Sequence, residues 1–121
     1  QGEKKFREIE EKITLKILKK RNVVISLGGG AFLNNNIRKT VLNDHFSFWL
    51  QLNSKELIRR IKKNIKRPVA LNTTNNQLID LIKKRSNIYS KALYKIDCNN
   101  LRKVEIVNKI LNIYETQKTN S

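Results

Sequence analysis

The sequence predicts an α/β protein whose mainly parallel sheet is flanked by helices. Three short apolar segments, at 23–27, 46–52 and 94–98, alternate with longer segments in which apolar residues recur every three or four positions. The segment 23–27 is β-branched and does not alternate, which is typical of a strand buried on both faces. Glycines at 28–30 follow directly, and ligands bind beyond the carboxyl ends of such strands. A loose turn is the alternative interpretation of these glycines.

Helices are expected on both sides of this first strand. Residues 3–20 are predicted to form an amphipathic helix, because their apolar side chains are spaced by three, four and four positions. Arg7 and Glu10 lie three positions apart on this helix and can form an ion pair. The asparagines at 34–36 are suited to cap a short helix that extends to about residue 42.

The second predicted strand leads into a helix and then a loop. Ser54 is expected to cap a helix that extends to about residue 64. Residues 62–76 are predicted to be a mobile loop with many positive charges. Arg67 precedes Pro68 in this loop, and a residue before proline is disfavoured in helical geometry, so Arg67 should be extended.

The chain closes with a helix, a strand and a helix. The helix is predicted over 77–92 and carries Arg85 near its middle. The strand at 94–98 leads to Asn99 and Asn100, which are expected to cap the final helix. Only three strands are predicted in all, which is few for a parallel sheet.

The net charge and the length of the chain limit the classes of function that it can have. Lys and Arg outnumber Asp and Glu by 26 to 10, so the 121 residues carry a formal net charge of +16. Such an excess points to anionic partners: nucleic acid, an acidic membrane surface, or phosphorylated and carboxylated small molecules. The lysines are spread along the chain, so we interpret most of this charge as solvated surface. The length suits one domain over 1–121.

The single cysteine and the hydropathy pattern indicate the compartment. Cys98 alone excludes an internal disulfide and a cysteine metal cage, so a reducing, cytoplasmic setting is expected. A run of apolar residues long enough to cross a bilayer does not occur in the sequence, so no membrane association is expected.

Four motifs point to a known family. Gly2-Glu3-x-x-Phe6-Arg7-x-x-Glu10 is followed by Leu27-Gly28-Gly29-Gly30-Ala31, then Arg67-Pro68, then Arg85-x-x-x-Tyr89. In their order and approximate spacing the motifs resemble shikimate kinase over nearly the whole chain. The resemblance implies a P-loop kinase-like fold that transfers the ATP γ-phosphoryl group to the 3-hydroxyl of shikimate, with Mg²⁺, in aromatic amino acid biosynthesis through chorismate. It also implies a monomeric, cytoplasmic enzyme.

The resemblance implies a role for each matching residue. Arg7 and Arg85 would hold the shikimate carboxylate, since planar guanidinium groups suit that anion, and Glu10 would brace Arg7. Arg67 would be the catalytic lid residue, reaching ATP and the transferring phosphoryl group. Arg60 would lie against the adenine. Three glycines would bring backbone close to the ring of shikimate and its hydroxyls: Gly28, Gly29 and Gly30.

The chain departs from the family in one respect. It contains no G-x-x-x-x-G-K-[ST] motif, and therefore no P-loop lysine, no Mg²⁺-binding Ser or Thr, and no metal ligand of the kind the family uses. We therefore expect an N-terminally truncated shikimate kinase domain whose sheet is incomplete because the P-loop strand is missing. Unpaired neighbouring strands should make the isolated chain fold poorly, and it should be inactive as a kinase.

Three other functions remain open at this stage. One is a related small-molecule kinase such as a gluconate kinase, because a polyhydroxylated acid of similar size is chemically close. Another is a catalytically inactive, shikimate kinase-like binding protein. The third is a basic nucleic-acid-binding domain, which the aromatics at 46–49 disfavour because they lie in a predicted core strand. We expect no nucleic-acid partner.

Overall fold

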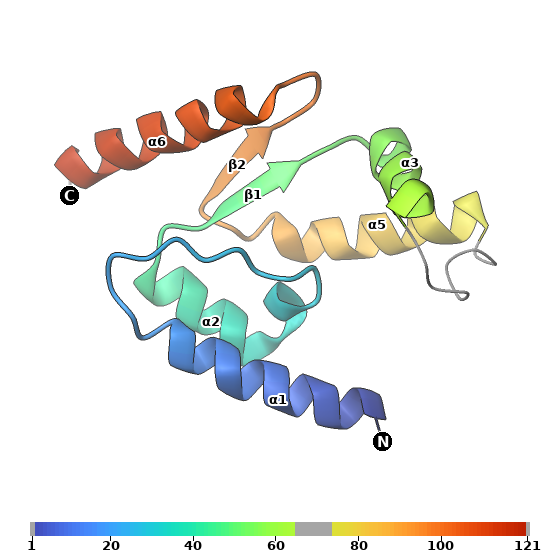
Figure 1. The fold of residues 1–121 in the computed structure, drawn as a ribbon, viewed down its shortest axis with the longest axis horizontal. Coiled ribbons are helices and arrows are strands. Elements are labelled where there is room, and N and C mark those ends of the chain that lie inside the picture. Colours follow the sequence, from blue (N-terminus) through green and yellow to red (C-terminus); the bar gives the residue numbers. More distant parts are fainter. Residues whose placement is uncertain (1, 65–73, 121) are drawn as a thin grey trace. The chain divides into compact units, whose positions relative to one another are not determined.

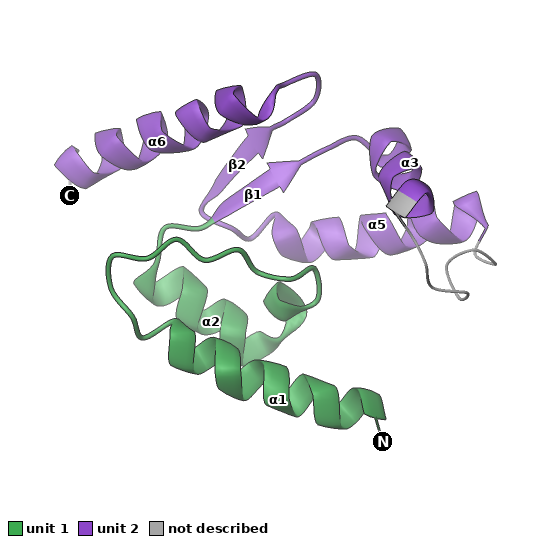
Figure 2. Cartoon of the chain, viewed as in Figure 1, with its two compact units in different colours: residues 1–47 green, residues 48–121 purple. Residues whose placement is uncertain are grey.

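The computed structural model describes residues 2–64 and 74–120 (Figure 1). The chain forms two compact units, which we call unit 1 (Gln1–Ser47) and unit 2 (Phe48–Ser121) (Figure 2). The expectation of one domain over 1–121 stays a prediction.

Unit 1 is built from three helical elements: α1 (Gly2–Ile17), the 3-10 helix η1 (Ala31–Leu33) and α2 (Asn35–Asp44). Helix α1 packs against both η1 and α2. The small core of this unit consists of the buried side chains of Leu18, Ala31, Phe32, Ile37 and Val41. The helix predicted at 3–20 is confirmed, although it ends at Ile17. Its apolar face stays substantially exposed, with Phe6 at 59%.

Polar side chains join α1 to the start of α2. Asn34 caps α2, because its Oδ1 accepts hydrogen bonds from the backbone N–H groups of Asn36 and Ile37, at 2.8 and 3.0 Å. The amide nitrogens of Asn34 and Asn36 both donate to Oε1 of Glu11, at 2.9 and 3.0 Å. These bonds favour the charged carboxylate and lower the pKa of Glu11. The predicted cap at 34–36 is thus confirmed.

The strand predicted at 23–27 is wrong. Residues 23–27 form no regular element, and Val24 is fully exposed. A β-strand exists only when neighbouring backbone groups pair with it, and the sheet of the described residues contains only β1 (Phe48–Gln51) and β2 (Tyr94–Asp97). The β-branched residues of this segment therefore indicate a preference for extended backbone, but they do not show that another strand pairs with it.

Unit 2 has the order β1, α3 (Ser54–Asn64), α5 (Asn75–Tyr89), β2 and α6 (Lys103–Asn120). The two strands pair in parallel, with Phe48 opposite Tyr94 and Gln51 opposite Asp97. The stacked rings of Phe48 and Tyr94, 5.3 Å apart, stabilise the pair at its first position. Because the strands are parallel and joined through helices, their carboxyl ends lie at one edge, as the predicted fold class requires.

The helix starts in unit 2 differ in detail from the sequence expectations. Helix α3 begins where predicted, but Asn53 rather than Ser54 accepts the hydrogen bond of the first turn, from the backbone N–H of Glu56 at 2.8 Å. Thr74 and Gln77 form a reciprocal capping box at the start of α5. Helix α6 begins at Lys103, after the Asn99 and Asn100 expected to cap it. Among the described residues, no helix is both long and apolar enough to cross a membrane.

Removing the cap of α2 should loosen that helix. We expect Asn34→Ala to destabilise α2 by about 1 kcal/mol, because two backbone N–H groups lose their acceptor. Amide hydrogen exchange in α2 should then become about fivefold faster, and exchange at the start of α5 should not change. In the control variant Asn34→Ser a capping oxygen remains while the hydrogen bond to Glu11 is lost as in Asn34→Ala, so most of the protection of α2 should remain.

The bonds to Glu11 make unit 1 sensitive to acid. Because the pKa of Glu11 is lower in the folded chain than its ordinary value of 4.5, its stabilising effect is complete above that pH and is lost as the pH falls through the folded value. The melting temperature of the chain should therefore fall more steeply between pH 6 and pH 3 than that of Glu11→Gln, followed by circular dichroism. Parallel pH profiles would contradict this assignment.

Candidate functional site

The guanidinium group of Arg7 lies directly against the backbone of Gly30. A Cβ atom built on Gly30 would overlap Nη1 of Arg7 and would lie 3.1 Å from its Cζ. Gly30 has ordinary right-handed dihedral angles, with φ of −90°, so its backbone does not require glycine. The absent side chain instead provides the space that the arginine occupies. Two residues predicted to share a ligand site are thus adjacent within unit 1.

Glu10 holds this arginine in place. Nη1 of Arg7 donates to Oε1 of Glu10 at 3.0 Å, from three positions away on α1, as the sequence predicted. Glu3 is more distant, with its Oε1 4.0 Å from Nη2 of Arg7. Nearly half of the Arg7 side chain is exposed, so the pair adds little to stability. Its effect is to orient the planar guanidinium group beside Gly30.

The other two predicted glycines precede Gly30 in the same turn. The carbonyl oxygen of Gly28 accepts a hydrogen bond from the backbone N–H of Ala31 at 3.1 Å, which begins the turn into η1. A Cβ on Gly28 would meet no atom within 4 Å, so the space beside this backbone is open. Gly29 lies between them in the turn. The approach of a ligand to these residues stays a prediction.

Arg85 lies on α5 in unit 2 and carries an unsatisfied donor. Within residues 2–64 and 74–120, its Nε is buried and has no hydrogen-bond partner. A buried donor without an acceptor is costly, and such groups commonly mark places where a ligand or water completes the bonding. An anion would supply the missing acceptor. Arg7 and Arg85 fall in different units, so their convergence on one carboxylate stays a prediction.

Part of the predicted site lies outside the described residues. Arg67, Pro68 and most of the predicted lid at 62–76 fall in the segment 65–73. The proposed contact of Arg67 with ATP is therefore untested by the structure.

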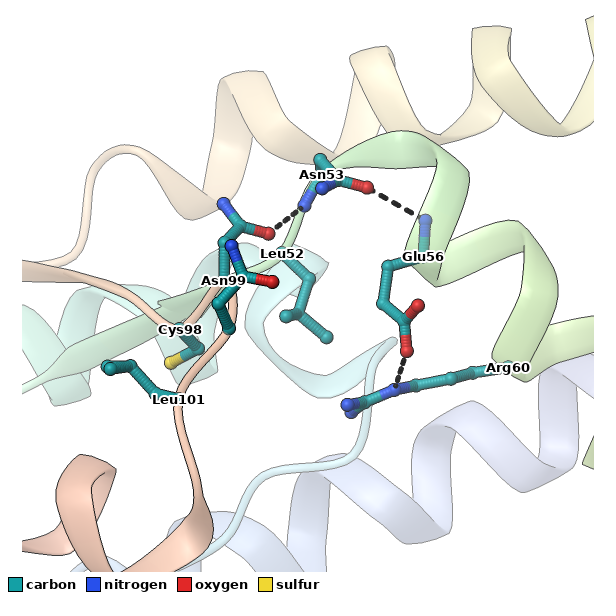
Figure 3. A pocket seen from close by; sticks show the side chains of 8 residues that line it. Leu52, Asn53, Glu56, Arg60, Cys98, Asn99 and Leu101 are labelled. Carbon is teal, nitrogen blue, oxygen red and sulfur yellow. Dashed lines mark hydrogen bonds and ion pairs between the residues drawn. The ribbon is translucent and has the colours of Figure 1, made fainter.

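A polar pocket of about 210 Å³ lies at the carboxyl ends of both strands in unit 2 (Figure 3). Residues that follow β1 and the first two turns of α3 form one part of its wall, and residues that follow β2 form the other. The lining residues are Leu52, Asn53, Glu56, Arg60, Cys98, Asn99, Asn100 and Leu101. The predicted adenine contact, Arg60, is therefore in a pocket at the position where parallel α/β sheets bind ligands.

Hydrogen bonds connect the two parts of this wall. Oδ1 of Asn99 accepts a hydrogen bond from the backbone N–H of Asn53 at 2.9 Å, and its Nδ2 donates to Asp97 at 2.8 Å. The backbone N–H of Cys98 continues the strand pairing to Gln51 at 2.9 Å. Burial and the nearby Asp97 raise the pKa of the Cys98 thiol, so it is protonated at neutral pH and a poor nucleophile.

Sequence reasoning missed Glu56, which is the centre of charge in the pocket. Its Oε1 accepts hydrogen bonds from Nη2 of Arg59 at 2.7 Å and from Nε of Arg60 at 2.9 Å, and its Oε2 accepts from Nε of Arg59 at 3.0 Å. These charge-assisted bonds lower the pKa of Glu56 to about 2. The spacing of three and four positions was a signal in the sequence that could have identified both pairs.

The described residues hold no cluster of metal-ligating side chains. Within 2–64 and 74–120, no three His, Cys, Asp or Glu side chains come close enough to share a metal ion.

Fold and pocket together define a parallel α/β protein with a ligand site at the carboxyl edge of its sheet. The chain belongs to the shikimate kinase family, whose model matches residues 1–115. That family has the P-loop kinase fold, and the two-stranded parallel sheet of the described residues is consistent with an incomplete form of it. The predicted fold class and family are thereby confirmed.

Curated relatives agree with this assignment. The chain is similar to a shikimate kinase of Bartonella henselae, with 33% identity over 112 residues, or 91% of this chain and 53% of the relative. It is 32% identical over 115 residues to a shikimate kinase of Thermodesulfovibrio yellowstonii, covering 94% of this chain and 66% of that protein. A shikimate kinase of Bartonella quintana is 36% identical over 93 residues, 75% of this chain and 44% of the relative.

The chain spans about half the length of the curated relatives it matches, between 44% and 66% of those three. A comparison with solved structures found no match.

Filling the space beside Gly30 should displace Arg7 without unfolding unit 1. In Gly30→Ala the new methyl group collides with the end of a flexible side chain and not with backbone, so the free energy of unfolding should change by less than about 1 kcal/mol. The Nε–H resonance of Arg7 should shift in the NMR spectrum as the pair with Glu10 rearranges. Gly2→Ala is the matched control, since a Cβ there meets nothing within 4 Å. An unchanged Arg7 resonance in Gly30→Ala would contradict the close approach.

Proposed function

We propose that this chain takes part in transferring the ATP γ-phosphoryl group to the 3-hydroxyl of shikimate, a step of aromatic amino acid biosynthesis through chorismate. The observation that carries the proposal is the Arg7 guanidinium, braced by Glu10 and seated on the bare backbone of Gly30. A planar cation beside exposed main chain suits a ligand with a carboxylate and hydroxyl groups. Membership of the shikimate kinase family supports the choice of ligand.

In this proposal the arginines contact different parts of the substrates. Arg7 and Arg85 hold the carboxylate, so that the ring lies with its 3-hydroxyl toward the nucleotide, and Gly28, Gly29 and Gly30 approach its hydroxyls. Arg67 offsets negative charge on the transferring group, and a lid at 62–76 excludes water when it closes. The unpartnered Nε of Arg85 supports its part in this scheme, because an anion would complete its hydrogen bonding.

ATP is the proposed phosphoryl donor, with its adenine in the unit 2 pocket beside Arg60. The G-x-x-x-x-G-K-[ST] motif does not occur in the 121 residues. The proposal therefore assigns acceptor binding, adenine binding and charge stabilisation to this chain, and it leaves the cradling of the phosphates and Mg²⁺ to groups outside it. We further propose that the protein is monomeric and cytoplasmic and that it binds neither nucleic acid nor membranes.

A binding role without catalysis is the second candidate, favoured by the absence of that phosphate-binding motif from the chain. Both candidates require a site for shikimate in these residues. They differ in whether phosphoryl transfer ever takes place there.

Shikimate binding to the full 121-residue chain tests the proposed site. We expect calorimetric titration to show binding of shikimate in preference to gluconate. Arg7→Lys should weaken it by about tenfold or more, because lysine keeps the charge but loses the planar fork. Arg21→Lys is the matched control, as Arg21 is an exposed arginine of the same unit, and its affinity should stay within about twofold.

The same protein should form no shikimate 3-phosphate from ATP, Mg²⁺ and shikimate. Shikimate 3-phosphate formed by this chain alone would contradict the proposal that groups outside the chain bind the phosphates and Mg²⁺. It would also exclude a role in binding without catalysis. In a sample that circular dichroism shows to be folded, an affinity for shikimate that is unaffected by Arg7→Lys, or no affinity at all, would overturn the assignment of the acceptor site.

A further inference from the structure

Resting on the proposed function, we propose that Glu56 is a positioning residue for nucleotide binding. Its carboxylate holds Arg60 at the pocket of unit 2 so that the flat guanidinium group can cover an aromatic base. Glu56 belongs to none of the four family motifs, and the structure shows that its carboxylate contacts both Arg59 and Arg60.

The ion pair between Glu56 and Arg60 restrains the direction of the Arg60 guanidinium group. Glu56 binds Arg60 through Nε, at 2.9 Å, which is the nitrogen closest to the aliphatic part of the side chain. A contact at Nε restrains the direction of the guanidinium group while leaving both of its terminal nitrogens and both of its faces available. In Figure 3 the Arg60 side chain extends from α3 along the pocket, and Glu56 contacts it at Nε, short of the terminal nitrogens.

The position of Glu56 is itself fixed by the strand ends. Its backbone N–H is bound by Oδ1 of Asn53, and the backbone N–H of Asn53 is bound in turn by Asn99, which follows β2. The first turn of α3 is therefore tied to both strands of the sheet. A glutamate on this turn is a rigid base for an arginine that is otherwise 56% exposed and long enough to adopt many rotamers.

The pocket suits one planar ring system. Its volume of about 210 Å³ is below the roughly 300–1,000 Å³ of sites that enclose a drug-sized ligand, so it fits part of a larger molecule. Leu52 and Leu101 supply apolar contact, and guanidinium groups stack favourably on aromatic faces. These features together describe the nucleobase of a nucleotide whose remaining groups lie outside the pocket.

The carboxylate of Glu56 binds two arginines, Arg59 and Arg60, and only Arg60 lines the pocket. Arg59 forms the bidentate contact with Glu56 but does not line the pocket. Hydrogen bonds from both arginines lower the pKa of Glu56 from 4.5 to about 2, further below the neutral range. The charge that orients Arg60 is therefore present throughout the neutral range.

Binding of adenosine and of inorganic pyrophosphate to the full chain, followed by NMR titration, tests the proposal. Glu56→Ala and Arg60→Ala should each weaken adenosine binding by about three- to tenfold, and the double variant should lose no more than Arg60→Ala, because both changes remove one contact. Arg59→Ala is the matched control and should stay within about twofold. Pyrophosphate binding should be the same in Glu56→Ala and the unsubstituted chain.

A ligand-independent measurement separates positioning from a general loss of structure. The Nε–H resonance of Arg60 should lose its hydrogen-bonded shift and its protection from exchange in Glu56→Ala, and should partly keep them in Glu56→Gln, which retains an acceptor oxygen. The backbone spectrum of β1 and β2 should not change in either variant.

Three results would overturn the proposal. The first is that the unsubstituted, folded chain binds no adenosine. The second is that Glu56→Ala binds adenosine as tightly as the unsubstituted chain, and the third is that the Nε–H resonance of Arg60 is the same in both. Failure of the proposed function is distinguishable from these, because it is read from shikimate affinity and Arg7 in unit 1.

Discussion

Parallel pairing of β1 with β2 is the constraint on which unit 2 depends. It carries two chain segments more than forty residues apart in sequence to the same edge, where Asn99 binds the backbone of Asn53 across a separation of 46 positions. Every residue that lines the pocket follows from that arrangement, since each comes either from the end of a strand or from the start of the helix after it. An antiparallel pairing would have placed these ends on opposite edges.

Both units fix an arginine by the same means. In unit 1, Glu10 lies three positions after Arg7 on α1, and in unit 2, Glu56 lies four positions before Arg60 on α3. Exposed pairs of this kind contribute little to the stability of a helix. Their value is orientation, because an arginine loses less entropy on binding an anion or a ring when its direction is already restricted.

The sequence predicted the helices well and the sheet less completely. Caps such as Asn34 and the recurrence of apolar residues are local signals, so the elements they mark appear at nearly the expected positions. The segment 23–27 has strand propensity as strong as that of the other two, yet pairing depends on a partner that no local pattern reveals. The adjacency of Arg7 and Gly30 was predicted through the family motif. The spacing of Glu56 indicates its pairs with Arg59 and Arg60, but only the three-dimensional arrangement places Glu56 in the pocket.

The buried Nε–H of Arg85 has a consequence for how this protein trades stability against function. A donor removed from water without an acceptor costs about 1–3 kcal/mol, so this helix would be more stable with an apolar side chain such as methionine in its place. In the proposed complex the carboxylate of shikimate completes this bonding, so the bound chain should unfold at a higher temperature than the unbound chain.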